Sequence, residues 1–138
     1  MPLFFRGRRG RGRPVTVCSV ALVSQSSDLH PYGEATVAIN RLEGFESLDV
    51  VGNLLPSPDS FGSAYGQYAF TLADPATGRV IETLLMTQLP GGTDWAGSFS
   101  PGVKTIPRGV VRVLPTPAGS VAGPFGPAVL RGDLRRCH

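Results

Sequence analysis

The chain of 138 residues carries a formal net charge of +3 and is 41% hydrophobic, which suits one globular domain whose core needs no metal or disulfide. Its 18 glycines and 13 prolines interrupt it too often for long helices, and no stretch approaches the ~20 apolar residues that span a bilayer as a helix. We therefore expect an all-β protein: an antiparallel β-sandwich, immunoglobulin-like or jelly-roll-like, with about seven or eight short strands.

The basic residues are unevenly distributed along the chain. Five of the 13 lie in an Arg/Gly-rich arm at residues 1–14, and the remainder of the chain has 8 basic and 10 acidic residues. The arm arginines are Arg6, Arg8, Arg9, Arg11 and Arg13. Guanidinium groups on a flexible backbone fork onto phosphates, so we predict that these five bind nucleic acid or another polyanion. Two alternatives remain, a solvated leader without a ligand and the basic segment of a secretory signal.

Residues 15–24, VTVCSVALVS, are apolar at both alternating sets of positions. They fit a strand buried on both sides or the apolar segment of a secretory signal. We favour the strand, because Cys18 interrupts the apolar run and no small-x-small cleavage pattern stands cleanly after it. In the signal interpretation, the protein would be exported after losing residues 1 to about 27.

Alternation with a period of two predicts most of the remaining strands. Residues 34–40 place Ala35, Val37 and Ile39 inward, and residues 110–114 place Val111 and Val113 inward. Other expected strands are 48–55, 95–100 with Trp95 against the core, and 128–130. The domain is expected to cover residues 15–130, and residues 131–138 to form a polar tail.

A β-hairpin is predicted at residues 65–87. Residues 74–78, DPATG, supply a turn in which Gly78 takes a left-handed conformation. Tyr68, Phe70 and Leu72 are expected on the buried face. If Asp74 faces Arg79, the strand pairs on that face are Leu72:Ile81, Phe70:Thr83 and Tyr68:Leu85, a register that keeps Glu82 out of the core. Gln67 and Thr71 are then assigned to the solvent face.

Two family resemblances follow from these segments. The hairpin with its preceding residues (62–87), then Trp95, Gly97 and Phe99, then GVVRVLP at 109–115, resemble bacterial immunoglobulin-like modules of spore-germination and cell-envelope proteins. That resemblance implies a binding or spacer domain. The arginine-rich arm resembles that of small viral coat proteins, where such an arm precedes a β-sandwich and binds the packaged genome.

No group of residues predicts catalysis, a metal or a cofactor. His30 lies in a polar loop without a nucleophile motif, and Cys137-His138 lacks the further ligands that zinc requires. Cys18 and Cys137 have no spacing that decides whether they pair. Arg131-Gly132-Asp133 spells an adhesion tripeptide, which carries little weight as a three-residue match.

The sequence therefore predicts a non-enzymatic structural or assembly protein, in a virion or a cytoplasmic assembly, whose arm contacts nucleic acid. A protein partner or self-assembly is expected for such a protein. The rival prediction is an exported immunoglobulin-like module that binds protein or polysaccharide at the cell envelope.

Overall fold

The computed structural model describes residues 15–26, 30–102 and 105–137. They form an antiparallel all-β fold, as the sequence predicted, with nine strands where about seven or eight were expected. The strands are β1 (Val15–Ser24), β2 (Tyr32–Asn40), β3 (Phe45–Asn53), β4 (Gln67–Ala73), β5 (Val80–Leu85), β6 (Thr87–Gln88), β7 (Trp95–Phe99), β8 (Val110–Thr116) and β9 (Leu130–Asp133). Two short 3-10 helices, η1 (Pro58–Phe61) and η2 (Leu134–Arg136), complete the described elements.

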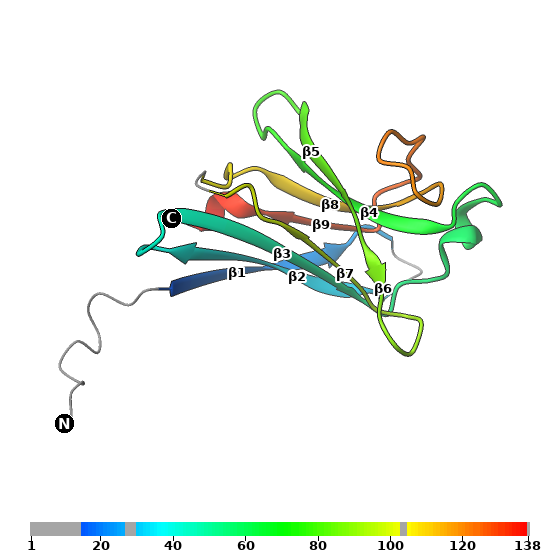
Figure 1. The fold of residues 1–138 in the computed structure, drawn as a ribbon. Coiled ribbons are helices and arrows are strands. Elements are labelled where there is room, and N and C mark those ends of the chain that lie inside the picture. Colours follow the sequence, from blue (N-terminus) through cyan, green and yellow to red (C-terminus); the bar gives the residue numbers. More distant parts are fainter. Residues whose placement is uncertain (1–14, 27–29, 103–104, 138) are drawn as a thin grey trace.

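All nine strands belong to one sheet that curls into a nearly closed barrel (Figure 1). Its order is β5-β4-β8-β9-β1-β2-β3-β7-β6, so the two outermost strands follow each other in the chain. Only Met86 separates them, and its N–H donates to the carbonyl of Tyr68 at 2.9 Å. The stretch 80–88 therefore pairs with β4 through its first part and with β7 through its last part.

The core fills the space that this curled sheet encloses. Phe70, Tyr68 and Met86 are fully buried in it, and the Tyr68 hydroxyl donates to the carbonyl of Pro56 at 2.7 Å. Trp95 is buried, as expected, and packs edge to face on Tyr68 with ring centroids 5.3 Å apart. The inward positions of β2 and β8 are also occupied as predicted: Ala35, Val37, Val111 and Val113 are buried and Ile39 packs against the core.

Residues 15–24 form strand β1, in the middle of the sheet order, so the strand interpretation is confirmed. Its expected burial on both sides is wrong. Val20 and Leu22 reach the core, whereas Val15, Val17 and Val23 on the opposite face are 46%, 63% and 59% exposed. The outer face of β1 is open because the domain has no second layer of described residues covering this face.

The hairpin exists, but its predicted register holds only at the turn. Asp74 N–H donates to the carbonyl of Arg79, and Gly78 has the expected positive φ of 75°. A bulge then shifts the pairing by one residue, so Leu72 faces Glu82 and Ile81 is left out of the ladder. The pairs of the sequence-based register are replaced by Leu72↔Glu82, Phe70↔Leu84 and Ala69↔Leu85.

The bulge also changes which side chains are buried. Glu82 stays half-exposed on the edge of β5, so the shifted register does not bury its carboxylate. Every residue of β4 from Tyr68 onward is buried, including Thr71, which was assigned to the solvent face. Leu85, expected in the core, is only half-buried.

The C-terminal residues are part of the sheet, which corrects the polar tail expected at 131–138. β9 pairs with β8 along its whole length and with β1 at Ser24 and Val23. Leu134 is fully buried, and Cys137 is buried as well. A tail was predicted because residues 131–138 contain few apolar side chains that could contribute to a core.

The bulge predicts unequal effects of truncation on the two hairpin arms. Leu72→Ala is expected to lower the free energy of unfolding by about 2–5 kcal/mol, because Leu72 is fully buried. Ile81→Ala is expected to cost about 1 kcal/mol or less, because the side chain is 44% exposed. Urea unfolding of both variants measures this, and equal losses would mean that Leu72 and Ile81 face each other in the core after all.

Candidate nucleic-acid interface

The five arm arginines proposed to bind nucleic acid, Arg6, Arg8, Arg9, Arg11 and Arg13, lie outside the described residues. The structure does describe the place where the arm joins the fold. This is the start of β1, where Val15 pairs with Asn40 of β2. The elements that contact β1 are therefore described first.

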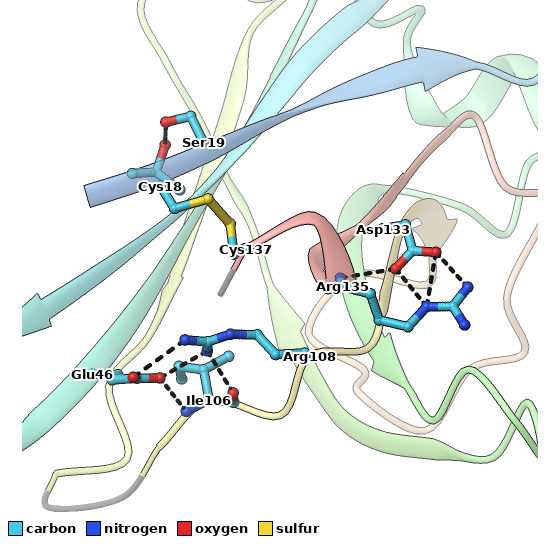
Figure 2. The surroundings of a disulfide bond; sticks show 9 residues. Cys18, Ser19, Glu46, Ile106, Arg108, Asp133, Arg135 and Cys137 are labelled. Carbon is cyan, nitrogen blue, oxygen red and sulfur yellow. Dashed lines mark hydrogen bonds and ion pairs between the residues drawn. A yellow bond between two sulfur atoms is a disulfide. The ribbon is translucent and has the colours of Figure 1, made fainter. Parts of the chain in front are cut away.

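Cys18, three residues into β1, is joined by a disulfide to Cys137 (Figure 2). The bond closes a loop with a sequence separation of 119 residues, and the two Cα atoms are 5.8 Å apart. The sequence had left this pairing open. Because Cys137 directly follows η2, the bond ties the end of η2, which carries Arg135 and Arg136, to β1.

Most arginines of the folded domain lie on the last three described elements of the chain. Four of the seven arginines among the described residues lie on β8, β9 and η2. They are Arg112, Arg131, Arg135 and Arg136. Sequence reasoning had assigned the basic character to the arm alone and missed this cluster, which we call the arginine face. The alternation in β8 did place Arg112 on the other face of the strand from Val111 and Val113. The pairing of β8 with β9 adds Arg131, which is 19 residues further along the chain.

Arg112 and Arg131 are direct cross-strand neighbours. Their neighbours in the chain, Val111, Val113 and Leu130, point into the core, so both guanidinium groups are on the outer face of the sheet. Within the described part of the chain, neither side chain makes a hydrogen bond or an ion pair. Two like charges directly opposite each other destabilise a sheet, so this pairing is unfavourable in the absence of a bound anion.

Arg135 behaves differently, because Asp133 holds it. Its Nη2 and Nε donate to the Asp133 carboxylate at 2.6 and 3.1 Å, and its Nε and backbone N–H also reach Oδ1. These bonds from Arg135 lower the pKa of Asp133 to about 2, and the charge of Arg131 acts in the same direction. Asp133 is therefore ionised at neutral pH. Arg135 binds it directly and Arg131 acts on it through its charge, whereas Arg112 and Arg136 have no ion pair among the described residues.

A hollow of about 290 Å³ opens where β1 and β9 separate beyond their two paired residues. Arg131 and Arg136 line it on one side, together with Asp133. Its other wall consists of Val20, Ala21, Val23 and Gln25 from β1 and the residue after it. The hollow thus offers two guanidinium groups beside an apolar wall, which is chemistry suited to an anionic group carried on a partly apolar ligand.

Glu46 and Arg108 form a second ion pair near the disulfide, and its role is structural (Figure 2). Arg108 Nη1 and Nη2 lie 2.8 and 3.3 Å from the carboxylate, and Ile106 N–H donates to it at 2.9 Å. The hydrogen bond from Arg108 lowers the pKa of Glu46, and the Ile106 N–H adds to this while burial opposes it. The pair fastens the segment before β8 to β3.

Of the other residues considered for chemistry, His138 lies outside the described residues. His30 is exposed, and Cys137 is held in the disulfide and is not available as a metal ligand. Arg131-Gly132-Asp133 lies in a strand, where a Cβ on Gly132 would come within 2.6 Å of Leu22. Among the residues described, no three of His, Cys, Asp and Glu gather to hold a metal. In the same residues no helix has the length and apolar character to cross a membrane.

Comparison with known proteins identifies one family. The family model described as SPbeta prophage-derived uncharacterized protein YoqH matches residues 14–138, which covers every strand and both cysteines. No curated protein and no solved structure matches the chain.

The disulfide is expected to stabilise the domain strongly. Replacing both Cys18 and Cys137 with Ser should lower the free energy of unfolding by about 2–5 kcal/mol, because the unfolded chain is freed from a very long closed loop. Denaturant unfolding with and without a reducing agent measures this. The reductant should destabilise the wild type and leave the double variant unchanged. Two free thiols in the native, unreduced protein would contradict the pairing.

The Glu46 pair predicts a dependence of stability on pH. The folded-state pKa of Glu46 is lowered, so its contribution is present above the unfolded pKa of about 4.3 and is lost as the pH falls through the folded value. Glu46→Gln should therefore lower the thermal midpoint at pH 7 and have little effect near pH 2. An equal loss at both pH values would show that shape, and not charge, explains the effect. Asp49→Asn, at an exposed position of the same strand, is the control.

Proposed function

We propose that this chain, which belongs to the YoqH family of SPbeta prophage-derived proteins, is a non-enzymatic structural component of a virion or similar large assembly whose arm contacts nucleic acid. The observation that carries the proposal is the Cys18–Cys137 bond. It ties β1, the strand that follows the arm, to the end of η2, which carries Arg135 and Arg136.

The charge balance supports an anionic partner. Outside the arm, acidic residues outnumber basic ones by 10 to 8, so overall charge does not explain a basic cluster on the fold. The cluster arises from placement, since four arginines share β8, β9 and η2. Arginine suits phosphate recognition because its planar fork donates two hydrogen bonds at once. Phosphate contacts bind without reading base sequence, as packaging of a genome requires.

The outer face of β1 supports the assembly part of the proposal. Val15 and Val17 are 46% and 63% exposed on one face of the middle strand of the sheet order, and neighbouring exposed apolar side chains suit a contact with another molecule. We propose that a second copy of the chain covers this face. The membership of a prophage-derived family is consistent with repeated copies in a virion.

One observation favours the rival proposal, an exported immunoglobulin-like module that binds protein or polysaccharide. Disulfides persist mainly in oxidising compartments, and the cell envelope is one of them. Loss of residues 1 to about 27 would, however, remove the whole of β1 and Cys18. We therefore retain the rival only in a form in which β1 stays with the domain.

Deletion of residues 1–13 tests the proposed function. A chain that starts at Pro14 should lose most of its binding to a single-stranded oligonucleotide while its thermal midpoint stays nearly the same, because the retained chain keeps every strand of the sheet. For the full chain, log affinity against log salt concentration should have a slope of about −3.5 to −4.5 if all five arm arginines engage phosphate.

A second test replaces two arginines within the arm. Arg8→Gln with Arg9→Gln should reduce the magnitude of the slope by about 1.4–1.8 and weaken all oligonucleotide sequences alike. Salt-independent binding, or full binding by the truncated chain, would refute nucleic-acid binding by the arm and favour the exported module.

A further inference from the structure

We propose that Arg112 and Arg131, with Arg136 at the edge of the adjoining hollow, form a fixed site for the phosphodiester backbone of a single nucleic-acid strand. This inference rests on the proposed function and deepens it, because it assigns a docking site on the folded domain in addition to the arm. Nothing in the sequence-based prediction located such a site outside residues 1–14.

The first argument is the unbalanced pair itself. Arg112 and Arg131 face each other across β8 and β9 without a hydrogen-bonding partner among the described residues. Asp133, the nearest acidic residue of β9, is already bound by Arg135. A bound phosphate placed between the two guanidinium groups would convert a repulsive pair into two charge-assisted contacts.

The second argument is the shape beside the pair. Arg131 is opposite Val23 of β1, and both line the hollow of about 290 Å³. The apolar wall of the hollow lies next to the guanidinium of Arg131, and a nucleotide likewise presents an apolar ring and sugar next to its phosphate. Gln25 supplies a polar group at the rim, although its amide nitrogen also donates to the carbonyl of Val23 at 3.0 Å.

The third argument is continuity with the arm. Arg136 lines the same hollow and directly precedes Cys137, whose Cα lies 5.8 Å from that of Cys18. The base of the arm is three residues before Cys18. The chain end that carries Arg136 is therefore tied covalently to the strand from which the arm extends, while Arg131 lies opposite Val23, further along the same strand. Joining two contacts in one molecule raises affinity through effective concentration.

The experiment uses the full, oxidised chain and a fluorescent oligouridylate of about 16 nucleotides. Fluorescence anisotropy over a series of salt concentrations gives the affinity and its salt slope. Arg112→Gln with Arg131→Gln should weaken binding by about tenfold or more and reduce the magnitude of the slope by about 1.4–1.8. Arg79→Gln is the control, because Arg79 is an exposed arginine with no ion pair in the part of the chain that the structure describes and lies after the hairpin turn. It should change the affinity by less than about threefold.

Two further measurements separate this inference from the proposed function. Unchanged binding by the Arg112 and Arg131 double variant, together with loss of binding on deletion of residues 1–13, would overturn the fixed site and leave the arm proposal standing. Weakened binding by the double variant, with full binding by the truncated chain, would support the fixed site and refute the arm. Binding to heparin but not to the oligonucleotide would overturn the site as one for nucleic acid.

Stability gives an independent readout. Because Arg112→Gln removes repulsion between neighbouring charges, its thermal midpoint should equal or exceed that of the wild type in the absence of a ligand. A saturating oligouridylate should raise the midpoint of the wild type more than that of the double variant. If the oligonucleotide raises both midpoints equally, the two arginines do not contact it.

Discussion

The architecture depends on one passage of the chain, at Met86, from one end of the sheet to the other. The N–H of Met86 bonds to β4, and the residue after Met86 begins the pairing with β7. This passage closes the sheet and encloses a single core. Gly97 lies at the same point, where a Cβ would stand 3.0 Å from the ring of Phe70 and 3.2 Å from the carbonyl of Leu85. The strands can approach this closely because residue 97 has no side chain.

Local patterning predicted the strands well because burial on one face leaves a period of two in the sequence. β1 and the start of β8 were predicted at their observed residues, and the turn at 74–78 was predicted with its left-handed glycine. The bulge at Ile81 was not predictable in this way. The energetic reason to keep Glu82 out of the core was sound, but the edge of β5 keeps it half-exposed in either register.

The candidate site was predictable only in part. The arm could be recognised because its five arginines lie close together in the sequence, at residues 6–13, whereas the arginine face depends on pairing between strands that are far apart in the sequence. Cys18 and Cys137 show the same limit: sequence separation carries no information on distance in space, and the sheet order brings the ends together. The exposed valines of β1 led to a wrong prediction of burial. An apolar run predicts that both faces of a strand are buried, but one face of β1 points outward.

The position of the disulfide has a mechanical consequence. A tension applied to the chain before Cys18 and after Cys137 would pass through the disulfide bond, because the force enters the closed loop at one cysteine and leaves it at the other. The chain between the two cysteines would carry almost no load, so within the sheet only the pairing of Val15, Thr16 and Val17 with β2 would be exposed to the pull. A force along the chain would thus pass from β1 to the end of η2 while the strands between the two cysteines stay paired.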